Sequence, residues 1–270
     1  MAKSFPILTL LICASAATAH AAKPPKELAI DLGGGVKLEM VLIPAGSFMM
    51  GDARGEYDER PVHKVNITKP FYLGKYEVTE EQWAAVTGTP HSKDAKDPKL
   101  PVTGLSWANC QPLLDKLNQR HGGKRDDSPG AFNLPTEAQW EYACRAGSTT
   151  RYHFGDDKKK LGEYAWYHDN SNGSKHPAGG KKPNAWGLYD MHGNVWELCR
   201  DAHYNHDYYA KSPTDDPPGP SEVLLKRDSR PIRGGGWNYT AWSCRSADRG
   251  YTTHPPRRNS QGFRVSRSVD

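Results

Sequence analysis

Three stretches in the N-terminal half of the chain alternate apolar and polar residues, at Val36–Ile43, 62–67 and 71–78. A period of two places every second side chain on one face of an extended segment, which is typical of a half-buried strand. We therefore predict three strands that form an N-terminal sheet.

Two helices are predicted from their capping residues. Thr79 and Gln82 form a capping box, and Gly88 can end the helix because glycine readily adopts a left-handed conformation. Ser106 is the expected N-cap of a second helix, and Pro112 is expected to delay or kink its start. The leucines that share one face of this helix are Leu113, Leu114 and Leu117.

A third helix is expected to begin after Thr136, which forms a capping box with Gln139, and to end at Gly147. Trp140 and Cys144 lie four residues apart in it. Residues at this spacing share one helix face, so we expect both side chains to point into the core.

The second half of the chain has little regular pattern. Residues 168–182 are polar and rich in glycine, and residues 211–220 contain four prolines, which indicates a long surface loop. The whole chain has 26 glycines and 21 prolines, and only 36% of its residues are hydrophobic. This composition favours a loop-rich α+β fold, and no shift in composition divides the 270 residues into two domains.

Residues 1–21 have the features of a secretory signal peptide. Lys3 precedes an apolar stretch at 5–17, and a small-x-small cleavage signal follows it. The prediction is export to a periplasmic or extracellular compartment. A lipid anchor on Cys13 is the alternative, but bulky Ile12 precedes it where lipidation signals carry a small residue. No later stretch is apolar for long enough to span a membrane.

Charge argues against a nucleic-acid partner. The net charge of +5 is modest, and the basic residues are dispersed except at 158–160 and 181–182. Runs this short are typical of solvated loops, whereas nucleic-acid binding usually needs a clustered basic surface.

The cysteines that follow the signal peptide are Cys110, Cys144, Cys199 and Cys244. In an oxidising compartment they allow three full pairings, and the sequence does not choose among them. One structural disulfide with two buried thiols is the alternative. Because no Cys-x-x-Cys pair is present, a cysteine metal site is disfavoured.

Two carboxylates, Asp190 and Glu197, flank a turn at Gly193 and Asn194. Such a turn takes positive φ angles at low cost, so carboxylate and main-chain oxygens can converge on a hard cation such as Ca²⁺. A turn in which both carboxylates only accept backbone hydrogen bonds is the alternative.

Five motifs occur in a fixed order along the chain. They are MVLIPAGSFMMG at 40–51, LPTEAQWEY at 134–142, PNAWGLYDMHGNVWELCRD at 183–201, RGGGW at 233–237 and GFR at 262–264. Together they resemble the sulfatase-modifying-factor family, which has the formylglycine-generating-enzyme fold. The resemblance implies an irregular, loop-rich α+β fold related to C-type lectins. It also places the domain at 38–268, after a lead-in at 22–37.

In the family, the turn motif forms a structural calcium site. When the family's ligand positions are carried over to this chain, the resemblance implies that the ligands are Asp190, Gly193, Val195 and Glu197. Aspartate replaces the usual asparagine at the first position, and an anionic oxygen there should bind Ca²⁺ at least as well.

The catalytically active branch oxidises a sulfatase cysteine with two cysteines that bind copper(I) after a Gly-Gly-Ser motif. Here Gly236 occupies the position of the family's serine, and Tyr239 occupies the position of the first cysteine. An alignment that runs on from the two glycines without gaps places Cys244 at the position of the second cysteine. An alignment that starts from the RSADR segment at 245–249 places Cys244 in the following strand instead. Since one thiolate is missing either way, the resemblance argues against copper and leaves Cys244 a weak catalytic candidate.

In the active branch the same region faces the substrate-peptide groove. The residues that the resemblance places there are Trp237, Asn238, Tyr239, Trp242 and Arg249. Tryptophan, tyrosine and arginine often anchor interfaces, so a peptide or protein is the expected partner. For Trp237, and for Arg264 outside this set, a core position is the preferred alternative.

Three functions remain open at this point. The first is a sulfatase-maturation oxidoreductase, and the second is a non-catalytic module that binds a peptide, protein or glycan. The third is an oxygen-dependent enzyme with other metal ligands, for which His203, His206, Asp201 and Asp207 are candidates, although an exposed loop is the preferred interpretation. Substrate and oligomeric state are not determined by the sequence.

Overall fold

The computed structural model describes residues 24–92, 97–124, 128–202, 207–220, 229–252 and 259–269. The predicted signal peptide and the histidines His203 and His206 lie outside these residues. Within them, no helix is long and apolar enough to cross a membrane.

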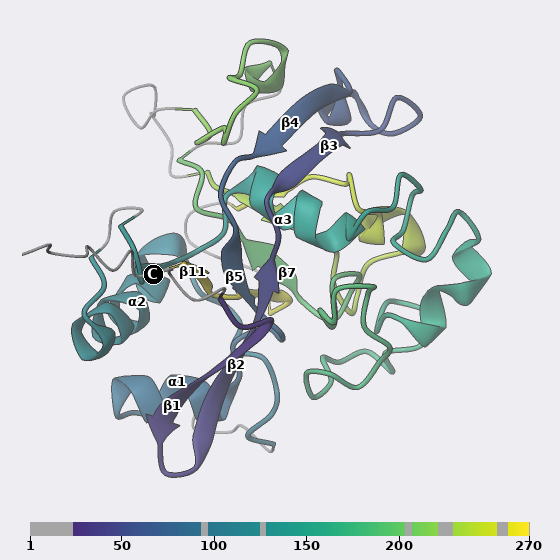
Figure 1. Cartoon of the computed structure of the whole chain (residues 1–270). Coiled ribbons are helices and arrows are strands. Elements are labelled where there is room, and N and C mark those ends of the chain that lie inside the picture. Colours follow the sequence, from purple (N-terminus) through teal and green to yellow (C-terminus); the bar gives the residue numbers. More distant parts are fainter. Residues whose placement is uncertain are drawn as a thin grey trace, which may run out of the picture.

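The main sheet has five strands in the order β1-β2-β5-β11-β6 (Figure 1). They are β1 (Glu27–Gly33), β2 (Val36–Ile43), β5 (Phe71–Gly74), β11 (Ser266–Ser268) and β6 (Phe132–Asn133), and every neighbouring pair is antiparallel. The N-terminal hairpin therefore pairs with the C-terminal strand through β5. Strands from both ends of the described chain therefore belong to one sheet.

A second sheet has the order β10-β7-β8-β9, with β7 (Trp196–Leu198) at its centre. Its other strands are β8 (Pro231–Arg233), β9 (Gly250–Tyr251) and β10 (Gln261–Gly262). Only the β10–β7 pair is parallel. A separate two-stranded ribbon joins β3 (Gly46–Met50) to β4 (His63–Ile67).

All three predicted strands exist, and β2 and β5 pair in one sheet as expected, but the third strand pairs elsewhere. β2 has the expected bounds, but β5 ends at Gly74 rather than at residue 78. β4 was expected in the N-terminal sheet and instead pairs with β3. Strand pairing depends on contacts between distant segments, so the local alternation of residues does not determine it.

The three helices begin where their capping residues predict. α1 (Glu80–Thr87) and α3 (Glu137–Arg145) have the expected capping boxes, and α2 (Trp107–His121) is capped by Ser106. The expectation that Pro112 delays the start of α2 is wrong, because the helix begins five residues earlier. The box between Ser106 and Asn109 fixes the first turn, and the proline removes only one later hydrogen bond.

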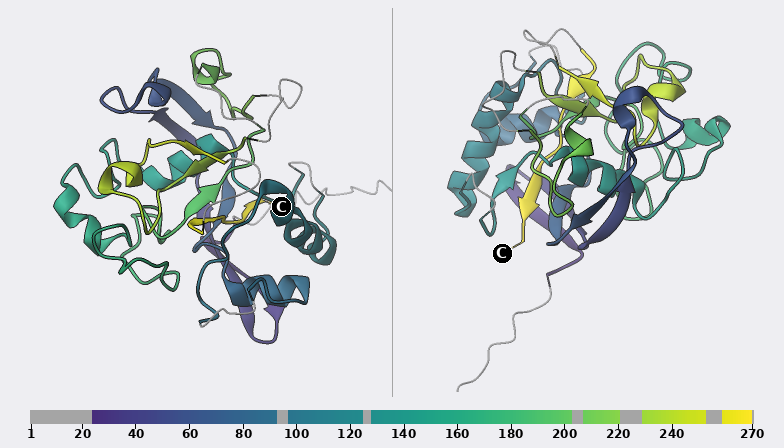
Figure 2. Two further views of the ribbon diagram at one scale, coloured as in Figure 1. Left: turned by 180° about the vertical axis from the view of Figure 1, so that it is seen from behind. Right: turned by 90° about the horizontal axis from the view of Figure 1, so that it is seen from above.

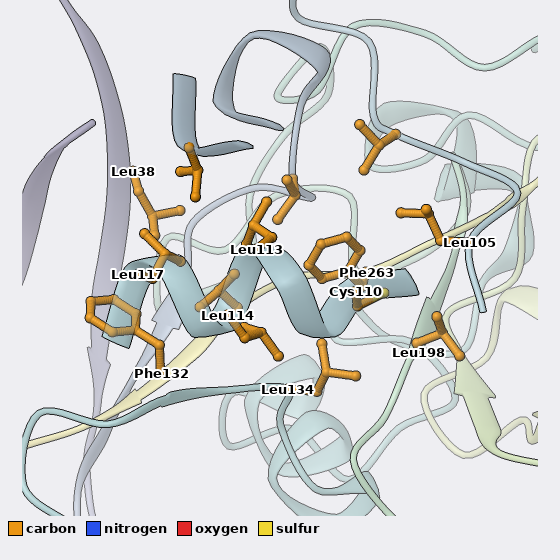
Figure 3. Close-up of a cluster of buried hydrophobic side chains, with 14 of the residues drawn as sticks. Leu38, Leu105, Cys110, Leu113, Leu114, Leu117, Phe132, Leu134, Leu198 and Phe263 are labelled. Atoms are coloured by element: carbon orange, nitrogen blue, oxygen red, sulfur yellow. The ribbon is translucent and has the colours of Figure 1, made fainter. Parts of the chain in front are cut away.

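α1 packs against β1, β2 and α2, whereas α3 lies between the β3–β4 ribbon and β8 (Figures 1 and 2). One hydrophobic cluster surrounds the buried face of α2, where the three predicted leucines meet Phe132 and Phe263 (Figure 3). A second cluster lies between α3 and strands β2 to β5, and it contains Trp140 and Cys144, which are both fully buried as predicted. The two clusters enclose β7 and the turn that precedes it.

Short 3-10 helices and long loops make up the rest of the described chain. The 3-10 helices are η1 (Tyr57–Glu59), η2 (Lys158–Glu163), η3 (Tyr208–Ala210) and η5 (Ala241–Cys244). Residues 147–195 contain η2 and otherwise form turns and loops, which confirms the loop-rich α+β prediction.

Candidate functional site

The turn before β7 is built on left-handed backbone. Asp190, Gly193 and Asn194 have φ angles of 57°, 94° and 56°. A Cβ at Gly193 would collide with the carbonyl oxygen of Trp166, so only glycine fits there. Gly193 N donates to Gly234 O at 2.7 Å, and Asn194 N donates to Trp166 O at 2.7 Å. These bonds hold both flanking carboxylates in the interior.

Glu197, the second carboxylate of the turn, is held by an arginine. Its Oε1 accepts from Arg264 Nη2 at 2.6 Å, and its Oε2 accepts from Arg264 Nε at 2.6 Å. Trp140 Nε1 donates to the same Oε2 at 2.7 Å. Arg264 is fully buried, so the preferred core interpretation of this residue is confirmed.

Two further buried carboxylates, Glu77 and Asp190, accept hydrogen bonds only from uncharged groups. Glu77 accepts from Asn194 Nδ2 at 2.6 Å and from Val195 N at 3.0 Å. Asp190 Oδ2 accepts from Gly179 N at 2.6 Å. Its other oxygen, Oδ1, is buried without a hydrogen-bond partner in the part of the chain that the structure describes.

Few positive charges lie near Asp190 and Glu77, and the pKa values of both carboxyl groups are raised. Burial raises the pKa of Asp190 to about 6, and the Glu197 charge adds to this against the opposing effect of Arg264. Burial, together with the charges of Asp190 and Glu197, raises the pKa of Glu77 well above its ordinary value. We call Glu77, Asp190, Glu197 and Arg264 the acidic cluster, because it carries more negative than positive charge when ionised.

Asp190 is the carboxylate of this cluster that could accept a cation. Asp190 Oδ1 is an anionic oxygen without a partner, which is what a hard cation would use. Glu197, in contrast, is already paired with Arg264. Among the described residues, no group of three or more His, Cys, Asp and Glu side chains is arranged to hold a metal ion. Any Ca²⁺ ligands beyond Asp190 would therefore have to include main-chain oxygens, as predicted for Gly193 and Val195.

The segment after β8 folds back on itself. A Cβ on Gly235 would lie 2.7 Å from the sulfur of Cys244, so the glycine lets η5 approach the backbone. Cys244 is fully buried at the end of this 3-10 helix, not in the strand suggested by the RSADR segment. Burial raises the pKa of its thiol far above the ordinary value. The ring of Tyr239 packs edge-on against Trp196, with 5.3 Å between ring centroids.

A family model described as the sulfatase-modifying factor enzyme 1-like domain matches residues 35–269. The chain belongs to this family. The formylglycine-generating enzyme of Streptomyces coelicolor is 32% identical in an alignment 289 residues long, gaps included, and the alignment covers 85% of this chain and 89% of that enzyme. The serine/threonine-protein kinase pkn1 of Chlamydia pneumoniae is 31% identical over 262 residues, and the match covers 86% of this chain but only 38% of the kinase.

Solved structures agree with this assignment. Treponema denticola variable protein 1 superposes with a TM-score of 0.79 at 26% identity, covering 91% of this chain and 100% of that one. PvdO from Pseudomonas aeruginosa superposes with a TM-score of 0.76 at 28% identity, covering 92% and 100%. The predicted sulfatase-modifying-factor fold, with its relation to C-type lectins, is confirmed.

The five residues expected in the groove of this sulfatase-modifying-factor domain differ in exposure. Asn238 and Trp242 are exposed, and Trp237 and Tyr239 are half-buried. Arg249 is different, because its guanidinium lies in the interior, where Nε and Nη2 donate to Glu137 at 2.7 and 2.8 Å. Four of the five side chains therefore reach the surface at least in part.

The four cysteines in the described part of the domain form no disulfide. Cys110, Cys144, Cys199 and Cys244 are each a free, buried thiol, so the interpretation with one structural disulfide is not supported by the structure. Cys144 Sγ lies 4.0 Å from His192 Nδ1, and this nitrogen is 2.7 Å from Cys244 O. Burial raises the pKa of all four thiols.

Sequence reasoning missed Glu77, which completes the acidic cluster. The alternating pattern gave no signal for its burial, because Glu77 stands, like Lys75, at a polar position of the stretch 71–78. The ion pair between Glu137 and Arg249 was also missed. Both residues belong to quoted motifs, but the motifs lie 112 positions apart and do not show that they meet.

Proposed function

We propose that the protein is an exported, calcium-stabilised sulfatase-modifying-factor domain that binds a peptide or protein and does not oxidise cysteine with copper. The position of Cys244 carries this proposal. A two-sulfur copper(I) site needs two accessible thiolates. Here the one thiol of the segment is buried with a raised pKa, and the first position holds Tyr239, packed on Trp196.

An exposed aromatic surface supports the binding role. The indole of Trp242 is 42% exposed, and its Nε1 donates to Glu56 Oε1 at 2.8 Å. The guanidinium carbon of Arg245 lies 3.9 Å from the Trp242 ring centroid, and Arg245 is itself fixed by Glu59. Tyr57 follows Glu56 and is 69% exposed. Aromatic side chains that are already ordered lose little entropy on binding, which makes them effective interface anchors.

Calcium is proposed for the acidic cluster on the strength of Asp190. Its orphaned oxygen and its raised pKa both reflect negative charge without a counter-ion. A bound Ca²⁺ would supply that charge, and the carbonyls of Gly193 and Val195 are the proposed main-chain ligands.

Formylglycine-generating activity is the second candidate function. The observation that favours it is the relation to the Streptomyces coelicolor enzyme, because the match covers most of both chains. In this alternative Cys244 would have to become accessible and act with ligands other than a second cysteine.

One experiment separates the two candidates. A peptide containing Cys-x-Pro-x-Arg is incubated with the protein, copper and oxygen, and mass spectrometry distinguishes the thiol from the aldehyde. We expect the thiol to persist, because a single buried thiol does not form the two-sulfur centre. Aldehyde above the no-protein control would contradict the proposal. A Tyr239→Cys variant that gains copper binding would show that both positions can reach one ion.

The binding role has a separate test. Peptides selected from a random displayed library on the immobilised protein should bind Trp242→Ala at least tenfold more weakly, since truncation of a central aromatic anchor commonly costs about 2 kcal/mol. The matched control is Tyr251→Ala, another exposed aromatic. Equal binding by the two variants would rule out the Trp242 surface.

A further inference from the structure

The ribbon of β3 and β4 has one covered edge and one open edge. On the β4 side, Asn66 N donates to Thr214 O at 2.8 Å, and Asn66 O accepts from Asp216 N at 2.9 Å. Among the described residues, no strand pairs with the other side of β3. An open edge can pair with another chain where its main-chain groups point away from the sheet.

The hydrogen bonds of Asn66 show which groups of β3 point outward. In an antiparallel pair, opposite residues either exchange both main-chain hydrogen bonds or exchange none. Asn66 lies opposite Ser47 and directs both of its groups to the loop at 214–216, so the N–H and C=O of Ser47 also point away from β4. Met49 lies at the same phase of the strand, opposite Lys64. Within the described part of the chain, no hydrogen bond reaches these outward groups of Ser47 and Met49.

This edge of β3 is exposed and lacks the features that usually block pairing. Ser47 is exposed, and Met49 is 50% exposed. Proteins commonly protect an open edge with proline or with charged side chains, whereas Gly46–Met50 contains neither. The whole segment 40–51 carries no charged residue. The edge therefore suits an uncharged partner, since it offers no counter-ion to a charged one.

A row of aromatic rings lies next to β3 on its inner face. The ring centroid of Phe48 lies 5.3 Å from that of Tyr142 on α3, and Trp186 packs edge-on against the same tyrosine at 5.0 Å. α3 contacts β3, and Figure 1 shows it on the side of β3 opposite to β4. Phe48 and Trp186 are both half-buried, so the row reaches the surface. We call Phe48, Tyr142 and Trp186 the aromatic shelf.

We propose that the open edge of β3 binds an extended, uncharged peptide segment, which pairs with β3 as an added strand and places an apolar side chain on the aromatic shelf. Ser47 and Met49 supply the main-chain hydrogen bonds, and the shelf selects the side chain. The chain runs from β3 to Glu56, which binds the Trp242 indole, so the edge adjoins the Trp242 surface. This proposal deepens the peptide-binding role proposed above and rests on it.

The alternation of an added strand gives the sharpest test. Peptides are selected from a random displayed library on the immobilised full protein. The tightest is then resynthesised in two forms, N-methylated at its odd or at its even residues. Only alternate residues of an added strand turn their N–H groups towards β3, so one form should bind at least about tenfold more weakly than the other. Equal affinities of the two forms for the wild-type protein would overturn the proposal.

Ser47→Pro tests the same pairing from the side of the protein. Proline removes an N–H that β4 does not use, so the ribbon should still form. We expect the unmethylated peptide to bind this variant about fivefold more weakly, because one main-chain hydrogen bond is lost. Ser47→Ala is the matched control, since it keeps the N–H and changes only the side chain, and it should bind like the wild type. Equal affinity for the two variants would contradict strand addition.

Lysine placed at each peptide residue in turn tests the shelf. It should weaken binding most at the residue opposite Phe48, because burial on the shelf leaves its charge without a partner. Uniform tolerance of lysine would overturn the shelf contact.

Further outcomes separate this proposal from the proposed function. The melting temperature of Ser47→Pro shows whether its fold is intact, and the two methylated peptides decide the question on the wild type even if it is not. Peptides that show no alternation but bind Trp242→Ala more weakly would overturn strand addition and leave the proposed function in place. No peptide enriched above a bare support would contradict the peptide-binding function itself, and strand addition with it.

Discussion

Two clusters of buried charged side chains contact Trp140, and the pKa values of their carboxylates differ although burial acts on both. In the acidic cluster, the Arg264 guanidinium is in contact with Glu197, whereas Glu77 and Asp190 feel its charge only at a distance. In the other, which we call the arginine cluster, Glu137 and Glu141 meet three arginines. Those arginines are Arg145, Arg233 and Arg249.

The pKa values of the two clusters move in opposite directions. Burial would raise the pKa of Glu137 and of Glu141, but the neighbouring arginines outweigh it, so both pKa values are lowered. The pKa values of Asp190 and Glu77 are raised, because the same burial meets too little positive charge. Burial therefore does not decide the ionisation state by itself. The number of cations in contact decides the ionisation state, and the acidic cluster has fewer of them.

Removing an arginine from the arginine cluster should have the largest effect. Arg233 is fully buried and ion-paired with Glu141, so Arg233→Met leaves buried negative charge uncompensated. We expect a loss of about 3–5 kcal/mol in the free energy of unfolding, measured by chemical denaturation. Arg54→Met, which removes the pair between an exposed arginine and Asp52, should cost far less because water screens the Arg54 charge. Equal losses would show that the arginine cluster does not depend on charge balance.

Adding a cation to the acidic cluster should have the next largest effect. Ca²⁺ at about 100 times its dissociation constant should stabilise the wild type by about 2.7 kcal/mol, visible as a higher melting temperature that a chelator reverses. Asp190→Asn should gain less from Ca²⁺ because the ligand loses its charge, and it should be more stable than the wild type in chelator.

Asp169→Asn, which changes an exposed carboxylate that contacts His168 and Tyr167 outside the acidic cluster, is the control for the calcium experiment. A melting temperature that neither Ca²⁺ nor chelator changes would refute the calcium site. Glu197→Gln is a less useful variant, since it also breaks the pair with Arg264.

The difference between the two clusters also explains what the sequence could and could not predict. Helix starts were predicted well, because a capping box such as Thr136 with Gln139 is complete within four residues. The turn at Gly193 and Asn194 was predicted for the same reason, and both residues have the expected positive φ. Local chemistry is sufficient where the partners are neighbours in sequence.

Contacts between distant residues were the ones missed. Arg249 was assigned to the groove from its motif, but its partner Glu137 lies 112 residues away and holds it in the interior. Glu77 meets Val195 across 118 residues. Neither the pairing of β3 with β4 nor the free state of four buried cysteines follows from local pattern, because both depend on which surfaces the fold brings together.

A smaller effect is expected from Asp201, a buried carboxylate beside the arginine cluster whose Oδ2 accepts from Glu137 N. Burial, with the nearby Glu137 charge, raises the pKa of Asp201 to about 7. A carboxyl group with a raised pKa binds its proton more tightly in the folded state, so it contributes stability that is present below its unfolded pKa of about 4 and is lost as the pH rises to about 7.

Asp201→Asn removes this titration while the side-chain oxygen can still accept from Glu137 N. The melting temperature of the variant should therefore fall less than that of the wild type between pH 5 and pH 8, with a difference of at least about 2–4 °C at pH 8, which corresponds to 1 kcal/mol in a domain of this size. Parallel curves for the two proteins would mean that Asp201 does not titrate in this range.

The smallest effect is expected where neither cluster is touched. Glu163 and Lys182 form an ion pair at 2.7 Å, with side chains 49% and 62% exposed. Water screens both charges, and the pair orders two long side chains, so Glu163→Gln should leave the free energy of unfolding close to that of the wild type, by denaturation at about 0.15 M salt. The comparison with Arg233→Met is informative because both variants remove one charge from a short ion pair. A loss for Glu163→Gln as large as that for Arg233→Met would mean that contact distance matters more than burial in this protein, and the contrast between the two clusters would then need a different cause.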